Sequence, residues 1–325
     1  MKRALVTGAN GHIGSNVVRD LLDHEYEVVA MVRPNADRRG LEGLRVVERK
    51  GDVLDAASVR AAVEGCSHVF HLAAPYITWA RDPDSIIAPA VLGTENVLRA
   101  AKSAGVERVV VTGSCNAVGF TKGEPLDETT FRAAARSPYM RAKREQELRA
   151  VELARELGLH VTVVLPTTVL GPYDYRKTPT TAAMVDVLRG KQPVPFPMNL
   201  VDVRDVAAGH RLAAEHGASG ERYLLGGSDT TMGELATLVE AQTGKRPKEG
   251  LPPEWVLRAV AAVSETVARI SGKAPIISDA VLDDVAGGVP LFRIDKAKKN
   301  LGYAPRGPGE VIAATHQWAR TMNWV

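Results

Sequence analysis

The chain has 325 residues, of which 45% are hydrophobic and 24% charged, and its formal net charge is +3. These values are typical of a soluble globular protein with room for one large domain or two smaller ones. The mild charge gives no indication of a nucleic-acid or membrane partner, and no apolar run approaches the roughly 20 residues that a membrane helix needs.

The expected compartment is the cytoplasm. Residues 1–3 lead directly into the first predicted strand, which leaves no room for a signal peptide. The two cysteines, Cys66 and Cys115, stand in predicted loop or strand-end positions, and nothing in their placement indicates a disulfide or a metal site.

Residues 3–14 predict a site for a pyrophosphate. A short apolar strand is followed by three glycines and then by a helical pattern. Gly8 permits the tight turn, Gly11 lets the backbone approach the phosphates, and Gly14 lets the helix pack against the strand. The N–H groups at the helix start favour an anion. The spacing is G-x-x-G-x-x-G rather than the standard G-x-G-x-x-G, and the residues expected at the cofactor are Thr7, Gly8, Asn10, Gly11, His12, Ile13 and Gly14.

Strand and helix patterns alternate through the first half of the chain. Strands are predicted at residues 27–32, 67–72, 108–112 and 160–165, with a weaker one at 46–48, and helices at 58–63, 86–104 and 139–157. Alternating elements with continuous apolar strands indicate a parallel sheet covered on both faces. The predicted fold class is therefore α/β, with a doubly wound parallel sheet of the Rossmann type and a smaller, interleaved C-terminal lobe.

The composition changes after Pro166, where prolines break the chain into short pieces. Residues 1–166 are predicted to form the dinucleotide-binding domain and residues 167–325 mainly a substrate-binding lobe. The segment 201–243 is predicted to return to the first domain.

A helix with an apolar stripe is predicted at residues 252–271. The stripe consists of Trp255, Val256, Ala259, Val260, Val263 and Val267. Core packing is favoured over a membrane or partner helix, because few basic residues flank the segment.

Arg33 stands at the end of the second predicted strand, where the type of dinucleotide is decided. A carboxylate there would bond the adenine-ribose hydroxyls, whereas an arginine suits a 2′-phosphate. The one nearby acid, Asp37, lies beyond Pro34. NADP(H) is therefore preferred and NAD(H) remains possible, although a solvated surface arginine would look the same. Asp52, followed by Val53 at the third strand end, is expected near the adenine, with an exposed turn aspartate as the alternative.

Tyr139 and Lys143 are four residues apart at the start of a predicted helix and project from one face. A free phenol has a pKa near 10, and a nearby ammonium favours its phenolate. Ser114 follows the fifth strand, at the sheet edge where open α/β sheets bind ligands. Ser114 could hold a substrate oxygen while Tyr139 transfers a proton, with Thr112 as a fallback hydroxyl.

The chain resembles the extended short-chain dehydrogenase/reductases, which carry a TGxxGxxG turn and a YxxxK pair. His71-Leu72-Ala73-Ala74 is similar to their fourth-strand end, and Pro166 to Pro172 resembles their PxxxxGP stretch beside the nicotinamide. The resemblance covers nearly the whole chain. It implies further cofactor contacts from Leu72, Ala73, Ala74, Thr112, Tyr139, Lys143, Pro166 and Thr168. The oligomeric state stays open, although helices 86–104 and 139–157 are those that pair in homodimers of similar proteins.

One branch of that family is favoured. Residues 88–94 are similar to the KPAVxGT stretch of dihydroflavonol and cinnamoyl-CoA reductases, and sugar epimerases usually carry Asn where this chain has Ala90. Residues 173–227 also resemble hopanoid-associated sugar epimerases. One departure is Gly113-Ser114, where many members have Ser-Ser, so Ser114 is the hydroxyl left at the serine position.

The predicted function is NADPH-dependent reduction of a small-molecule aldehyde or ketone by a Ser114–Tyr139–Lys143 site, without a metal. The alternatives are a sugar epimerase or dehydratase and a non-catalytic NADP-sensing protein. His71 and Cys115 are interpreted as packed residues. Tyr76, Trp79, Phe120, Tyr173 and Met184 could form an apolar substrate pocket, with ordinary loop anchoring as the alternative for each of them.

Overall fold

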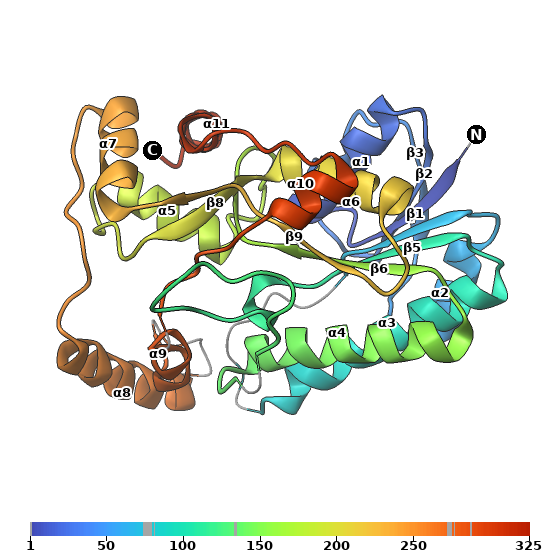
Figure 1. Ribbon diagram of the computed structural model, residues 1–325, viewed down its shortest axis with the longest axis horizontal. Coiled ribbons are helices and arrows are strands. Elements are labelled where there is room, and N and C mark those ends of the chain that lie inside the picture. Colours follow the sequence, from blue (N-terminus) through green and yellow to red (C-terminus); the bar gives the residue numbers. More distant parts are fainter. Residues whose placement is uncertain are drawn as a thin grey trace.

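The computed structural model describes residues 2–73, 80, 82–132, 135–271, 275, 277–286 and 288–325. Its centre is a seven-stranded parallel sheet with the strand order β3-β2-β1-β4-β5-β6-β9 (Figure 1). The strands are β1 (Arg3–Thr7), β2 (Glu27–Val32), β3 (Val46–Lys50), β4 (His68–His71), β5 (Arg108–Thr112), β6 (Val161–Pro166) and β9 (Arg222–Leu225).

Helices cover both faces of this sheet, so the domain has three layers (Figure 1). One face carries α1 (His12–Asp23), α6 (Val203–His216) and α10 (Asp295–Leu301), and the other carries α2 (Ala56–Val63), α3 (Asp84–Ser103) and α4 (Pro138–Leu157). The central strands are buried on both sides, as Val-rich runs such as residues 109–111 require. The predicted doubly wound fold is confirmed.

A second, three-stranded sheet supports the C-terminal lobe. It consists of β10 (Ser228–Thr230), β8 (Met198–Asp202) and β7 (Thr168–Leu170). Side chains from this sheet form a separate apolar core with the helices α5 (Pro179–Leu188), α7 (Met232–Thr243) and α11 (Pro308–Thr321). The short elements β7, β10 and α5 were not predicted. Whether residue 166 divides two domains stays a prediction.

The helix α8 (Glu254–Ser271) forms as predicted, but its expected core packing is wrong. Trp255 is 74% and Ile270 81% exposed, while the inner side of the helix carries small residues such as Ala261 and Ala268. The other large apolar side chains of α8 that are exposed are Val260, Val263 and Val267. Helical periodicity revealed the stripe but not its direction. α8 lies at the edge of the molecule beside α9 (Asp279–Val285), away from the large sheet (Figure 1).

Among the described residues, no helix combines the length and apolar character that a membrane crossing requires.

Candidate active site

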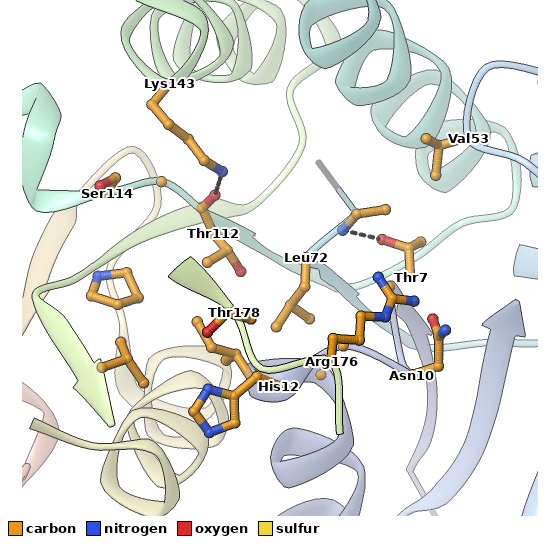
Figure 2. A pocket seen from close by; sticks show the side chains of 18 of the residues that line it. Thr7, Asn10, His12, Val53, Leu72, Thr112, Ser114, Lys143, Arg176 and Thr178 are labelled. Atoms are coloured by element: carbon orange, nitrogen blue, oxygen red, sulfur yellow. Dashed lines mark hydrogen bonds between the residues drawn. The ribbon is translucent and has the colours of Figure 1, made fainter. Parts of the chain in front are cut away.

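A cavity of about 680 Å³ opens at the carboxyl ends of the central strands. This volume lies within the range of roughly 300–1,000 Å³ that is usual for ligand sites. Because the strand order is β3-β2-β1-β4-β5, the lining passes from Asp52 and Arg33, past the glycine turn, to Ser114, Tyr139 and Lys143. Figure 2 shows Ser114 and Lys143 on one side of the cavity, and Asn10 and Arg176 on the other.

The glycine turn is built as the sequence predicts. Gly8 has a φ of 68°, and a Cβ there would lie 2.9 Å from the backbone nitrogen of Ala73. A Cβ on Gly14 would lie 2.1 Å from the carbonyl oxygen of Gly8, so only glycine lets α1 start this close to β1. The N–H of Gly11 closes the turn on the same carbonyl at 3.0 Å.

The start of α1 suits an anion. Its N-cap is Gly11, which has no side chain to bond the first N–H groups, and its first turn holds no acidic residue. Those N–H groups and the positive end of the helix dipole therefore remain for a ligand in the adjoining cavity. The residues present thus fit the pyrophosphate of a dinucleotide.

Ser114 and Tyr139 reach the cavity from two different elements. Ser114 follows β5 and caps a short helix (Cys115–Ala117), and its Oγ accepts the N–H of Asn116 at 3.2 Å. Tyr139 lies in the first turn of α4, whose N-cap Ser137 is buried and accepts the N–H of Met140. Ser114, Tyr139 and Lys143 all line the cavity that begins at the glycine turn.

Lys143 is a buried cation. Its Nζ donates to the carbonyl oxygen of Thr112 and to Oε1 of Gln146, each at 3.1 Å (Figure 2 draws the first of these bonds). Burial lowers the pKa of Lys143 to about 8, and the charge of Glu147 opposes this shift. The ammonium is therefore held in place but is less firmly protonated than a surface lysine.

A buried chain of hydrogen bonds connects Lys143 with the glycine turn. Gln146 Nε2 donates to Thr94 Oγ1 at 3.0 Å, and His71 bonds Thr94 through Nε2 at 3.1 Å and Thr7 through Nδ1 at 2.9 Å. The hydroxyl of Thr7 also accepts the N–H of Ala73. The chain therefore joins the helix of Tyr139 to the strand that carries the cofactor turn.

The hydrogen-bond partners assign the tautomer of His71. Thr94 uses its hydroxyl proton on the carbonyl of Ala90, so it accepts from His71 Nε2–H. His71 Nδ1 then accepts the hydroxyl proton of Thr7. Burial and then the charge of Lys143 lower the pKa of His71 to about 3, which keeps it neutral. The interpretation of His71 as a packed residue agrees with these contacts.

Two other groups near the site, the hydroxyl of Thr112 and the thiol of Cys115, are poorly suited to bind or react with a substrate. The hydroxyl of Thr112 lies 2.9 Å from Nε2 of His210, whose Nδ1 donates to the carbonyl of Val206. Burial lowers the pKa of His210 to about 4, so its Nε2 accepts the Thr112 proton. Burial also raises the pKa of the Cys115 thiol to about 12. Ser114 is thus better suited than Thr112 to bond a substrate oxygen.

The arginines beside the second strand differ in what they bind. Arg38 bonds Glu48 at 3.0 Å and Arg39 bonds Asp37 at 2.6 Å. Arg33 lines the cavity, is exposed and forms no ion pair with any described residue. Its guanidinium therefore remains for a ligand.

Nearly all of the predicted cofactor residues line the cavity. Those that do are Thr7, Gly8, Asn10, Gly11, His12, Ile13, Gly14, Arg33, Asp52, Val53, Leu72, Ala73, Thr112, Tyr139, Lys143 and Pro166. Thr168 is not among the lining residues, whereas its neighbours Thr167 and Val169 are. Alternation along a strand explains this, since successive side chains point to opposite faces. Ala74 lies outside the described residues.

Of the residues predicted for the substrate pocket, those that the structure describes do not line the cavity. Tyr76 and Trp79 lie outside the described residues. Phe120 and Tyr173 do not line the cavity, and Met184 is buried in the C-terminal core. The ring of Tyr173 instead packs against Trp318, with centroids 5.3 Å apart.

The prediction missed a second group of lining residues. Besides Met31, Gly51, Leu54, Pro89 and Gly113, the missed residues are Arg176, Lys177, Thr178, Pro179 and Thr180 before and at the start of α5. Thr178-Pro179 is an N-cap followed by proline at the first helical position, a local signal that could have located this helix start.

Among the described residues, no group of three His, Cys, Asp or Glu side chains is placed to hold a metal ion.

The fold and the cavity define a dinucleotide-dependent enzyme. The model of the NAD dependent epimerase/dehydratase family matches residues 4–226. The chain belongs to this family and, within it, to the extended short-chain dehydrogenase/reductases of the dihydroflavonol reductase and cinnamoyl-CoA reductase-like branch. It is therefore an NAD(P)-dependent enzyme.

Curated relatives are similar over most of the chain. A protein of Synechocystis sp. that is provisionally named dihydroflavonol 4-reductase is 32% identical, over 98% of this chain and 95% of its own. Sterol demethylase protein B of Methylococcus capsulatus is 35% identical over 82% of both chains. Cinnamoyl-CoA reductase 1 of Oryza sativa subsp. japonica is 39% identical over 72% of this chain and 74% of its own.

Solved structures agree along the full length. The crystal structure of gox2253 is 36% identical, with a TM-score of 0.87 and full coverage of both chains. UDP-glucose 4-epimerase of Thermotoga maritima, solved with UDP-glucose, is 25% identical, with a TM-score of 0.78 and 99% coverage of both.

Proposed function

We propose that the protein is an NADPH-dependent reductase of a small-molecule aldehyde or ketone. The observation that carries the proposal is that Ser114, Tyr139 and Lys143 line one cavity with the glycine turn. A proton donor, an oxygen-binding hydroxyl and a cation therefore stand at the end of the site where the nicotinamide of a dinucleotide would lie. The relatives named as reductases support the same reaction class.

The bound nicotinamide supplies a hydride to the carbonyl carbon of the substrate. Tyr139 donates its phenolic proton to the carbonyl oxygen, and Ser114 bonds that oxygen and orients it. The buried ammonium of Lys143 stabilises the phenolate that remains and offers a donor to the nicotinamide ribose. The proton on Tyr139 is restored from solvent after the alcohol forms. A carbonyl, a proton and a hydride thus give one alcohol.

The preference for NADPH rests on Arg33. Its guanidinium lines the cavity at the end of β2 and forms no ion pair with any described residue, which suits a 2′-phosphate. The acid of that region, Asp37, is engaged with Arg39. We expect the Kd for NADPH to be lower than that for NADH, with the difference lost in Arg33→Ala.

A second candidate is a sugar epimerase or dehydratase that oxidises and then reduces its substrate on one retained cofactor. The similarity to a UDP-glucose 4-epimerase favours it, since that structure covers 99% of the chain. The resemblance of residues 88–94 to dihydroflavonol and cinnamoyl-CoA reductases favours the reductase instead.

One experiment separates the two candidates. The purified protein is assayed at about 340 nm with NADPH and NADH against a panel of aldehydes and ketones, and the products are examined for deuterium from 4-deuterated NADPH. A reductase consumes one equivalent of NADPH per alcohol and places the label on the carbonyl carbon. Conversion of a UDP- or dTDP-sugar without net NADPH consumption, by protein that retains NAD after purification, contradicts the proposal.

A further inference from the structure

The segment of residues 171–178, between β7 and α5, runs along the cavity. Its last members Arg176, Lys177 and Thr178 line the same cavity as Asn10 and the glycine turn. Figure 2 shows the side chain of Arg176 extending toward the side where Thr7 and Asn10 lie. A cation from the C-terminal lobe therefore faces the turn that suits a pyrophosphate.

Buried hydrogen bonds fix the conformation of this segment. Tyr173 and Lys177 adopt positive φ angles of 66° and 51°, which residues other than glycine rarely do. Between them, the fully buried carboxylate of Asp174 accepts the N–H groups of Arg176 and Thr178 at 3.3 and 2.8 Å, and the hydroxyl of Thr178 at 2.6 Å. Asp174 therefore fixes the direction in which the chain presents Arg176.

The segment is also anchored on the helix that starts at the glycine turn. Asn16 of α1 donates to the carbonyl of Pro172 at 3.2 Å, and the guanidinium of Arg19 lies 3.9 Å from the ring centroid of Tyr173. From α11, Nε1 of Trp318 donates to the carbonyl of Asp174. These contacts fix the position of the Arg176 backbone relative to α1, and all of them are contacts within the protein.

The charge of Arg176 is not neutralised by an ion pair with any described residue. The carboxyl group of Asp37 has its pKa lowered to about 2 mainly by its hydrogen bonds with Arg39, and the charge of Arg176 adds to this effect. Arg38 and Arg39 have carboxylate partners. An exposed guanidinium that lines a cavity opposite a helix N-terminus is suited to a phosphate oxygen.

We propose that Arg176 is a second anion-binding residue of the cofactor site, which binds a phosphate of the dinucleotide together with the glycine turn. The inference rests on the proposed dinucleotide-dependent function. The phosphate could belong to the pyrophosphate or to the ribose 2′-phosphate. Because Arg176 shares its part of the cavity with Asn10 and the turn, the pyrophosphate is favoured. Arg33 then binds the 2′-phosphate of the adenine ribose.

The test compares Arg176→Ala, Arg33→Ala and Arg189→Ala by titration calorimetry with NADPH, NADH, ADP and 2′-AMP. Arg189 is an exposed arginine at the end of α5 that does not line the cavity, so it controls for the loss of one positive charge. We expect Arg176→Ala to raise the Kd of NADPH, NADH and ADP about tenfold or more, and to leave 2′-AMP unchanged. Arg33→Ala should raise the Kd of NADPH and 2′-AMP but not that of NADH or ADP. Arg176→Lys should recover part of the affinity that Arg176→Ala loses.

An unchanged Kd for NADH and ADP in Arg176→Ala, while the wild-type protein binds both, overturns this inference and leaves the proposed function standing. If Arg176→Ala raises the Kd of NADPH and 2′-AMP but not that of NADH or ADP, the assignment to the pyrophosphate is also overturned. A wild-type protein that binds neither dinucleotide overturns both proposals. Unfolding temperatures of the free variants identify any loss that arises from misfolding.

Discussion

Oδ2 of Asp284 accepts the backbone N–H of Ser137 at 2.7 Å, two residues before Tyr139. Oδ1 of the same carboxylate accepts the N–H of Arg136 at 2.8 Å and Nη2 of Arg132 at 2.9 Å. Asp284 is buried and belongs to α9 of the C-terminal lobe. The lobe that is expected to bind substrate therefore also fixes the start of the helix that carries Tyr139.

Asp284→Asn is expected to misplace Tyr139. The amide places an NH₂ group against a backbone N–H, so the loop before α4 must shift, and small shifts near reacting groups cost about 10- to 100-fold in rate. We expect kcat to fall by about that factor while the Kd of NADPH changes less than about threefold. Asp283→Asn, which removes contacts with Arg136 and Arg258 nearer the surface, is the control and should lose little activity. Equal rates in both variants would refute the positioning role.

The pH dependence of reduction should reflect Lys143. Its pKa is lowered to about 8, so the ammonium beside Tyr139 is lost as the pH rises through 8. We expect kcat/KM to decline above about pH 8, and Lys143→Arg to move this decline to higher pH, because a guanidinium stays charged. A profile that is flat to pH 10 in the wild-type protein would contradict this assignment.

Lys143 should also affect stability, and here its contribution should increase with pH, whereas kcat/KM decreases. The folded-state pKa of Lys143 is below the unfolded value near 10.4, so the unfolded chain binds more protons between about pH 8 and 10. The contribution of Lys143 to stability therefore rises over this range. Thermal unfolding of the wild-type protein and Lys143→Met between pH 7 and 10 measures it, since the variant lacks that rise.

His71 should make the protein sensitive to acid. Its pKa is lowered to about 3, whereas an unfolded histidine titrates near 6.5. Stability from this residue is complete above about pH 6.5 and is lost as the pH falls toward 3, by about 2 kcal/mol at pH 5. Urea unfolding at pH 7.5 and 5 should show that the free energy of unfolding falls less between these two pH values in His71→Leu than in the wild-type protein.

At pH 7.5, His71→Leu should itself lower the free energy of unfolding by about 2–4 kcal/mol, because the hydroxyls of Thr7 and Thr94 each lose a hydrogen-bond partner. His24→Gln changes an exposed histidine and controls for charge. An acid loss that is the same in His71→Leu and the wild-type protein would show that His71 is not the group responsible.

The sequence predicted those parts of the site that depend on local chemistry. A glycine turn between a strand and a helix and a Tyr139–Lys143 pair four residues apart are set by backbone and helix geometry, and both line the cavity. Arg176 was missed because its direction depends on Asp174, Asn16 and other residues distant in the chain. The bonds of Thr94 and His71 were missed for the same reason.

α8 shows a second limit of sequence patterns. Helical spacing of apolar residues predicts a stripe, and a core was the ordinary interpretation. The structure turns small residues inward and leaves Trp255 and Ile270 outside. Which side of such a helix is buried depends on its neighbours, here α9, and not on the helix itself.

Substitutions on α8 test this exposure. Ile270→Ser should change the free energy of unfolding by less than about 0.5 kcal/mol, because that side chain is 81% exposed. Leu153→Ala, in the fully buried face of α4, should cost about 2–5 kcal/mol. Both are measured by urea unfolding. A cost above about 2 kcal/mol for Ile270→Ser would show that the helix packs with its apolar stripe inward.

The most direct test of the central claim is the rate of carbonyl-dependent NADPH oxidation in the wild-type protein and Tyr139→Phe, together with the Kd of NADPH in both. The phenylalanine keeps the ring and removes the proton that reduction requires. We predict a fall in kcat of about 100-fold or more with an unchanged Kd for NADPH. Full NADPH-dependent reduction by Tyr139→Phe would contradict the account.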